Sequence, residues 1–422
     1  MKTHAAGLKQ SNRNKYTPLR NQEYGNRHGA PTDKTILVMP LIQRGITMKR
    51  LFLFAAALLM GTAAMAQRPY PFVSTAVAEF REPWAFEFLP DGRILVTEKA
   101  GTIQLVTQDG QKTEVAGAPE VVYRGQGGLG DIKLHPDFAS NNVVYISYVE
   151  GGADDTSGAV VARGTLDLSK PAVQNLEVIW RSVPKVTGAI HFSHRILFDD
   201  EGYMYVSAGE RNNNSENPPM SPSQRLDTNM GKILRLNDDG SPAAGNPFAA
   251  QGGPAAEVWS MGHRNPLGIA FDATGNLWNI EMAPRGGDEL NLVKPSLNYG
   301  YPYVSNGNHY NGIIIPDHDT DTEGRFEKPK VWWNPVISPT SLTFYNGDAF
   351  GPQWKGNAFI TGRSSRSIVR IAVNGENAQE AERFVMGLSM RGIKEGPDQN
   401  LWAIDDGGNN NGDGTLWKLS PR

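Results

Sequence analysis

The stretch Leu89-Pro90-Asp91-Gly92-Arg93-Ile94-Leu95-Val96-Thr97 joins a tight turn to an apolar, β-rich run. Pro, Asp and Gly favour turns, whereas Ile, Val and Thr favour strands. A second strand-like run, 102–106, follows at once and suggests a hairpin. The same turn-and-strand unit recurs along the chain, and its further copies begin at His135, Phe198, Phe271, Trp354 and Gly396.

Six copies leave about 60 residues for each unit, which suits one four-stranded sheet with a long loop, repeated radially. We therefore predict an all-β fold, a six-bladed β-propeller, that forms a single catalytic domain over 67–422. A β-sandwich is disfavoured because the same hairpin recurs too often, and a right-handed β-helix because the period is too long. In a propeller, the inner strands and their loops converge on an axial funnel, where residues distant in sequence can meet.

The N-terminal region has the features of an export signal. Residues 1–47 are polar, basic and aperiodic, and we interpret them as a misassigned upstream segment or a disordered leader. Residues 48–66 combine a charged start, an apolar run and a small-residue cleavage site, so we expect a signal peptide that is cut after Ala66. A single-pass anchor is the alternative, but the apolar run is short for a membrane span, and we expect no stable membrane insertion. The mature protein should then be periplasmic or secreted.

Composition excludes several function classes. The chain has 422 residues, a formal net charge of −3 and no cysteine. Nucleic-acid binding is not indicated because it calls for a clearly basic domain, and cysteine chemistry and thiolate zinc sites are impossible. The sequence contains no Gly-x-Ser-x-Gly elbow, no His-Glu-x-x-His and no dinucleotide fingerprint. An oxidoreductase with this sequence would therefore need another redox cofactor, held by Arg, Gln and a cation.

Polar loop segments supply candidate site residues. His191, in 189–195, can take up a proton near neutral pH, although a packing histidine is the alternative. Arg264, in 260–266, is a permanent cation that could polarise a carbonyl or bind a carboxylate, or simply form a surface ion pair. Carboxylates beside Gly and Pro carbonyls in 281–291 could hold a hard cation such as calcium, or could form a solvated acidic turn. Gln126 lies in a glycine-rich loop, where backbone can approach a ligand closely.

The ordered set of these motifs resembles a known family. Gln126-Gly-Gly-Leu-Gly, His191-Phe-x-x-Arg195, His263-Arg-Asn-Pro266, Gly287-Asp-Glu289 and Asn298-Tyr-Gly-x-Pro302 follow one another as in the soluble aldose sugar dehydrogenases that depend on pyrroloquinoline quinone (PQQ), relatives of soluble glucose dehydrogenase. The resemblance spans about residue 70 to the end. It implies a six-bladed propeller that holds PQQ in the axial funnel beside calcium. It also implies oxidation of the anomeric carbon of aldose sugars to lactones by hydride transfer to PQQ, with electrons passing to a periplasmic acceptor.

The resemblance also assigns roles to residues. His191 would be the general base, Glu210 would orient it, and Arg264 would stabilise the charge that develops on the cofactor. The carbonyls of Ala283 and Pro284 would meet the cofactor-bound calcium, and Glu289 and Tyr299 would hold a structural calcium. The remaining cofactor contacts would come from Gln126, Asn265, Tyr310, Gly362, Arg363, Ser364, Ser389 and Arg391.

Three positions depart from the family pattern. Ser364 stands near an expected lysine and Ser389 at an expected arginine, which could weaken PQQ binding by a few kcal/mol because charged hydrogen bonds contribute about 1.5–3 kcal/mol each. Arg363 or Arg366 could supply one missing cation. His194 replaces the usual glycine, and we expect it to narrow the pocket mouth or to add a titrating group there.

Two other functions stay open on the sequence. One is a calcium-stabilised propeller that has lost catalysis and binds a sugar or a protein partner, and the other is a propeller lactonase. The sequence specifies neither the preferred sugar nor the electron acceptor nor the oligomeric state.

Overall fold

Residues 70–213, 217–407 and 412–422 are described by the computed structural model of the protein. All of them lie in one compact unit, Pro69–Arg422. The expected leader, 1–47, and signal peptide, 48–66, fall outside the described residues. Within the described part of the chain, no helix is both long enough and apolar enough to cross a membrane.

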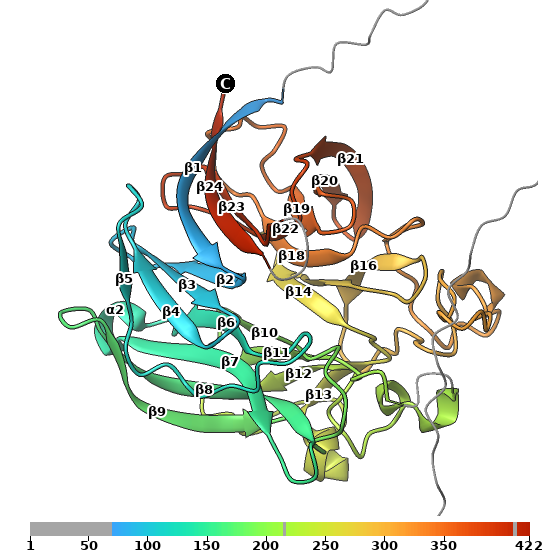
Figure 1. Ribbon diagram of the computed structural model, residues 1–422. Coiled ribbons are helices and arrows are strands. Elements are labelled where there is room, and N and C mark those ends of the chain that lie inside the picture. Colours follow the sequence, from blue (N-terminus) through green and yellow to red (C-terminus); the bar gives the residue numbers. More distant parts are fainter. Residues whose placement is uncertain (1–69, 214–216, 408–411) are drawn as a thin grey trace, which may run out of the picture. The chain divides into compact units, whose positions relative to one another are not determined.

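The described residues form six four-stranded sheets arranged around one axis (Figure 1). The innermost strands contact one another in cyclic order, and the last of them contacts the first. The predicted six-bladed β-propeller is therefore confirmed. Each recurring turn of the sequence connects the first and second strands of a blade, which explains why this turn was the repeated signal.

The strands are ordered outward from the axis in every blade. The innermost strands are β2 (Pro83–Phe88), β6 (Leu129–Leu134), β10 (Ser193–Phe198), β14 (Pro266–Phe271), β18 (Pro339–Phe344) and β22 (Met390–Glu395). The second strands are β3 (Ile94–Glu98), β7 (Val143–Gly151), β11 (Met204–Ala208), β15 (Leu277–Glu281), β19 (Ala358–Gly362) and β23 (Leu401–Asp405). The third strands are β4 (Thr102–Val106), β8 (Ser157–Asp167), β12 (Lys232–Leu236), β16 (Asp288–Val293), β20 (Ser367–Asn374) and β24 (Asp413–Pro421). The outer strands are β5 (Lys112–Glu114), β9 (Ala172–Arg181), β13 (Val258–Met261), β17 (Val331–Trp333), β21 (Asn377–Val385) and β1 (Phe72–Arg81).

The two ends of the described chain close the ring. β1 precedes all other strands in sequence, yet it forms the outer edge of the last blade and pairs antiparallel with β24. The helices are short and lie in connections between strands. They are α2 (Phe138–Asn141) and the 3-10 helices at Pro218–Met220, Pro222–Gln224, Ala249–Gln251, Gly253–Glu257 and His318–Thr320.

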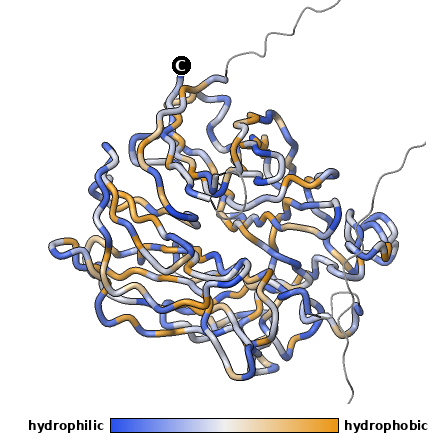
Figure 2. Tube along the Cα trace, viewed as in Figure 1, coloured by the Kyte–Doolittle hydropathy of each residue, from blue (hydrophilic) through white to orange (hydrophobic). Residues whose placement is uncertain are grey.

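The hydrophobic core is divided among the joints between neighbouring blades. Side chains alternate between the two faces of a strand, so one strand packs against both of the neighbouring blades. In β3, Leu95 packs toward the second blade, whereas Ile94 and Val96 pack toward the sixth. Figure 2 shows the hydrophobic residues concentrated along the strands. Since every joint is filled in this way, a large core forms without any disulfide.

The innermost strands share a length and a distortion that the repeat did not predict. Each has six residues, and each has a break in register with its second strand near its start. Such bulges redirect side chains. Consecutive residues of β10, His194 and Arg195, accordingly both contact residues of other blades. Close packing at the axis also requires Gly130, where a Cβ would lie 1.9 Å from the His194 ring.

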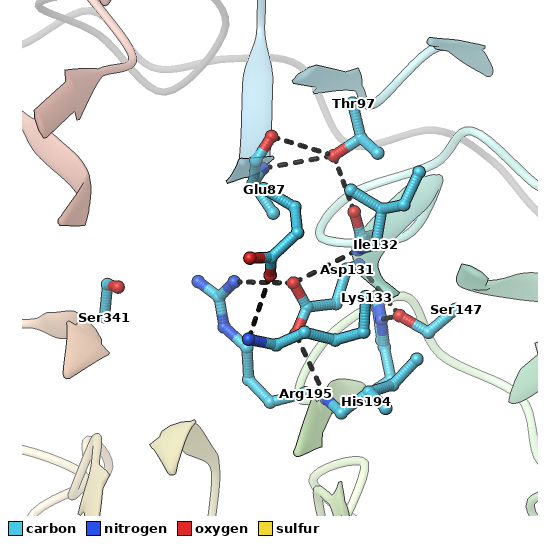
Figure 3. Close-up of polar contacts among 12 residues, drawn as sticks. Glu87, Thr97, Asp131, Ile132, Lys133, Ser147, His194, Arg195 and Ser341 are labelled. Carbon is cyan, nitrogen blue, oxygen red and sulfur yellow. Dashed lines mark hydrogen bonds and ion pairs between the residues drawn. The ribbon is translucent and has the colours of Figure 1, made fainter. Parts of the chain in front are cut away.

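Arg195 connects most of the innermost strands at the axis, and Figure 3 shows it beside Asp131. Its guanidinium is buried and donates to the carbonyls of Leu267 in β14 and Thr340 in β18, both at 2.7 Å. It also pairs with Asp131 in β6 at 3.4 Å and lies 3.9 Å from the ring centre of Trp84 in β2. One side chain from β10 therefore contacts four other blades.

A second charged group lies further along the same axis. Glu87, Lys133 and Lys394 each occupy the fifth position of an innermost strand, and both ammonium groups lie within 3.0 Å of the Glu87 carboxylate. Burial raises the pKa of Glu87, but the two lysines outweigh burial and lower it to about 2. Two ammonium groups and one carboxylate, from three blades, thus meet in the ring centre, and Figure 3 shows the pair of Glu87 and Lys133.

Replacing Arg195 with methionine should destabilise the fold strongly. The Arg195→Met protein retains the buried Asp131 carboxylate without its guanidinium, and removing one partner of a buried pair costs about 3–5 kcal/mol. Denaturant unfolding should show a loss of this size, whereas the exposed Arg93→Met control should lose less than about 1 kcal/mol. Similar small losses in both variants would show that Arg195 does not hold the blades together.

Candidate active site

His191 lies in the loop before β10 and is buried. Its Nδ1 is 2.6 Å from Oε1 of Glu210, and its backbone N–H donates to Oε1 of Gln126 at 2.8 Å. Since Nδ1–H is directed to the carboxylate, the other ring nitrogen, Nε2, is left as the proton acceptor. The geometry is that of an oriented general base.

The electrostatics of the loop favour a neutral imidazole. Burial, followed by the charge of Arg264, lowers the pKa of His191 below its ordinary value of 6.5, and Glu210 opposes this shift. A histidine with a lowered pKa is deprotonated at neutral pH. It is therefore ready to accept a proton.

The backbone that carries His191 is held in a strained conformation. His191 has φ 53°, a left-handed value that is uncommon for residues with a side chain. Gly209 is needed beside it, because a Cβ there would lie 2.1 Å from the His191 carbonyl oxygen. Arg211 fixes the same loop by donating to the carbonyls of Gly188 at 2.6 Å and Ile190 at 3.0 Å. Such strain persists where surrounding contacts enforce it, often at functional sites.

Arg264 approaches the same place from the fourth blade. Its Nη1 donates to the carbonyls of Met282 at 2.9 Å and Ala283 at 2.8 Å. Its Nε has no hydrogen-bond partner among the described residues, although it is buried, and the same is true of Nδ2 of Asn265. An unused donor on Arg264, which lines a cavity, fits a ligand that carries acceptor oxygens.

A cavity of about 260 Å³ brings together most of the residues predicted for catalysis. The predicted residues that line it are Gln126, His191, Arg264, Ala283, Pro284 and Tyr310. Tyr310 is 71% exposed and lies at the rim. Asp288 also lines this cavity, and its burial raises its pKa to about 7 even though its carboxylate accepts three backbone N–H groups.

A second cavity, of about 230 Å³, adjoins the first, since Gln126 and Met282 line both. Arg363 and Arg391, which were predicted to contact the cofactor, line it, and Trp84, Lys99 and Asp406 are additional lining residues. A larger cavity, about 720 Å³, lies at the other end of the innermost strands and is lined by neither His191 nor Arg264. Geometry and charge therefore favour the pair of smaller cavities as the candidate active site.

Other predicted residues lie outside both cavities. Asn265 is buried, and its Oδ1 accepts at 2.9 Å from the hydroxyl of Ser193, which lines the second cavity. Gly362 and Ser389 are buried but line neither cavity, and Ser364 is exposed and donates to the carbonyl of Val336. The side chains of Ser364 and Ser389 therefore contact neither cavity.

His194 differs from its sequence-based interpretation. It lies at the floor of the second cavity, not at a mouth, and stacks on Trp84 with 5.0 Å between ring centres. Its Nδ1 is 2.9 Å from the hydroxyl of Ser147. Burial, with the charges of Arg195 and Arg391, lowers its pKa to about 3. His194 is therefore a neutral packing residue and adds no titrating group near pH 7.

The residues expected to hold a structural calcium lie apart from both cavities. Glu289 is buried, 3.3 Å from Nε2 of His318 and 3.1 Å from Nδ2 of Asn291. Burial, followed by the nearby Glu281, raises the pKa of Glu289. Oδ1 of Asn291 is buried without a partner among the described residues. The hydroxyl of Tyr299 donates to Leu292, which leaves its carbonyl as the group that could face an ion.

Two residues of the second cavity, Trp84 and Leu267, escaped the sequence interpretation for an identifiable reason. Like His194 and Arg391, which the sequence analysis had named, they occupy the second position of an innermost strand and line this cavity. Counting back from each repeated turn to the start of its strand would have located them. Lys99 gave no such signal, because it follows β3 and reaches the cavity from a turn.

Comparison with known proteins identifies the family of this chain. The family model described as Glucose / Sorbosone dehydrogenase matches residues 80–418. The chain belongs to the glucose/sorbosone dehydrogenase family. The aldose sugar dehydrogenase YliI of Escherichia coli (strain K12) is 37% identical over 347 residues, which cover 81% of this chain and 90% of the relative.

Solved structures of family members have the same fold. The soluble aldose sugar dehydrogenase of Escherichia coli, in its apo-form, superimposes with a TM-score of 0.77 and 34% identity, and covers 83% of this chain and 100% of its own. The PQQ-bound aldose sugar dehydrogenase of Streptomyces coelicolor superimposes with a TM-score of 0.66 and 28% identity, and covers 84% and 99% of the two chains.

The contacts of His191 predict its titration behaviour. NMR of histidine-labelled protein, with the His191→Gln variant to identify the signal, should give a midpoint below 6.5, so that protonation appears only on acidification past this value. In Glu210→Gln the midpoint should fall further, because the carboxylate that stabilises the imidazolium is gone. A wild-type midpoint at or above 6.5 would contradict the electrostatic account.

Proposed function

We propose that the protein oxidises aldose sugars at the anomeric carbon to lactones, with PQQ as the bound oxidant. The supporting observation is that His191 with its orienting carboxylate and Arg264 with an unused donor line one cavity. Membership in the glucose/sorbosone dehydrogenase family and the PQQ-bound relative support the same substrate class and cofactor. PQQ, when bound, supplies an o-quinone that accepts the hydride from the sugar.

Residues of the chain would accept the proton and stabilise the negative charge that this reaction produces. Nε2 of neutral His191 accepts the proton of the anomeric hydroxyl, while Glu210 keeps Nδ1 protonated and stabilises the imidazolium that forms. The free Nε–H of Arg264 is available to an oxygen that gains negative charge, and its fixed position makes this donor preorganised. Gln126 holds the His191 backbone, and Tyr310 lies exposed at the rim where a sugar would enter.

The cationic cavity would anchor the carboxylates of the cofactor. Arg363 and Arg391 line it, and guanidinium groups suit bidentate contact with carboxylates. Asn265 contacts Ser193 of the cavity wall, and its amide donor has no partner among the described residues. Gln126 and Met282 line both cavities, so a single ligand could occupy both. Its carboxylates would lie in the cationic cavity and its reactive carbonyls in the catalytic cavity.

Calcium is part of the proposal at two places. Ala283 and Pro284 line the catalytic cavity, and their carbonyls would hold one ion. The Ala283 carbonyl also accepts from Arg264, so an ion there would share this carbonyl with the guanidinium. A structural ion would be held by Glu289 and the carbonyl of Tyr299. No group of three or more His, Asp or Glu side chains in the described ranges could hold a metal. Backbone and amide oxygens, which calcium readily accepts, would therefore complete the coordination.

The segment 48–66 supports export to the periplasm, where a separate redox carrier would take the electrons from the enzyme.

Reconstitution tests the proposed activity. Protein loaded with PQQ and calcium should reduce a redox dye when glucose or another aldose is added. His191→Ala should lose at least about 100-fold in turnover, because general-base catalysis contributes 10²–10⁴-fold, yet should bind PQQ normally. The matched His135→Ala variant removes a turn histidine outside the cavities and should stay active.

The competing functions give different outcomes. No turnover across a sugar panel with PQQ demonstrably bound would reject the dehydrogenase and favour a propeller that has lost catalysis. Lactone hydrolysis with calcium alone would favour a lactonase.

Calcium should stabilise the apoprotein through Glu289. A ligand at 100 times its Kd stabilises the folded state by about 2.7 kcal/mol, so calcium should raise the Tm of EDTA-treated protein. Glu289→Gln removes the buried charge and should abolish this rise, whereas the exposed Glu177→Gln control should retain it. An equal rise in both variants would place the ion elsewhere.

A further inference from the structure

Lys99 belongs to the cationic cavity although no motif assigned it there. Lys99 follows β3 in a turn whose backbone is fixed on both sides. The backbone N–H of Lys99 donates to the backbone carbonyl of Glu82, and the Lys99 carbonyl accepts from the N–H of Leu129 in the next blade. The anchored turn directs its side chain into the cavity of about 230 Å³ that Arg363 and Arg391 also line.

The ammonium of Lys99 is poorly paired for a group so little exposed. Its Nζ lies 3.4 Å from the Glu82 carboxylate and 3.3 Å from the Gly125 carbonyl, and its side chain is 12% exposed. Charge-assisted N–H···O contacts are usually about 2.7–2.9 Å long. Burial lowers the pKa of Lys99 and Glu82 opposes this, while Arg391 and Arg363 lower it further. The negative charge of an added anion would offset both the cost of burying the Lys99 ammonium and its repulsion by the two arginines.

The remaining charges in the cavity leave room for such an anion. The lining residues include three cations, Lys99, Arg363 and Arg391, against two carboxylates, Glu82 and Asp406. Asp406 is already committed to Arg363 at 2.7 Å. His194, also in the wall, stays neutral because its pKa is about 3. The cavity therefore has a surplus of positive charge beside a weak ion pair.

We infer that Lys99 is a cofactor-binding residue whose ammonium contacts a carboxylate of PQQ and supplies a cation that Ser364 and Ser389 cannot. The inference rests on the proposed function and deepens it. Ser364 is exposed, and neither serine lines the cavity. The family's usual cations are thus replaced from a different blade, since Lys99 comes from the first blade and both serines come from the last two.

The test is titration of PQQ into calcium-loaded protein, with binding followed by the change in quinone absorbance. Lys99→Met should raise the Kd by about tenfold to a hundredfold, the range for one charged hydrogen bond. Lys99→Arg keeps the charge and should bind within about threefold of wild type. Arg124→Met is the matched control: it removes an exposed cation, paired with Asp155, from the same region outside the cavity, and should leave the Kd unchanged.

The outcomes separate this inference from the proposed function. Unchanged binding by a folded Lys99→Met protein overturns the role of Lys99, and so does an equal loss in Arg124→Met, which would indicate a general field effect. If Lys99→Met does not fold, Lys99→Gln and Lys99→Arg decide, and equal affinity in these two overturns the inference. Failure of the wild type to bind PQQ overturns the proposed function itself.

Discussion

The guanidinium of Arg195, buried among the innermost strands, is the contact on which the rest of the structure depends. A propeller has no single central core: neighbouring blades pack against each other at their joints, and side chains that project to the axis add contacts among several blades. Arg195 donates to two blades, pairs with Asp131 in a third and packs on Trp84 in a fourth. The layer that it forms also supports the cavity floor, because Trp84 stacks on His194 above it. Stability and site geometry are therefore coupled.

The two adjoining cavities differ in the chemical groups that line them. One contains a neutral, oriented imidazole beside a fixed guanidinium, and the other concentrates cations. The strained loop that carries His191 is held by Gln126, Gly209 and Arg211, which come from two different blades. Positions set by several blades at once resist displacement, and such preorganisation is what catalysis by fixed charges requires.

The sequence predicted the blades but only part of the site. The turn beginning at Leu89 recurs because each blade needs the same connection between its first two strands, so local chemistry was sufficient there. His191, Arg264 and Gln126 were found because family motifs mark them. Lys99 and Arg195 gain their contacts only when the ring closes and bulges redirect the inner strands, which no local pattern encodes. The positions of Ser364 and His194 relative to the cavities likewise depend on how the closed ring arranges the blades.

The most direct measurement is a crystal structure of the protein grown with PQQ and calcium. The account predicts that the quinone spans both small cavities, with its dicarbonyl edge beside His191 and Arg264 and its carboxylates within about 3.5 Å of Lys99, Arg363 or Arg391. A quinone in the cavity at the opposite end of the innermost strands, or one bound with its carboxylates toward His191, would contradict it.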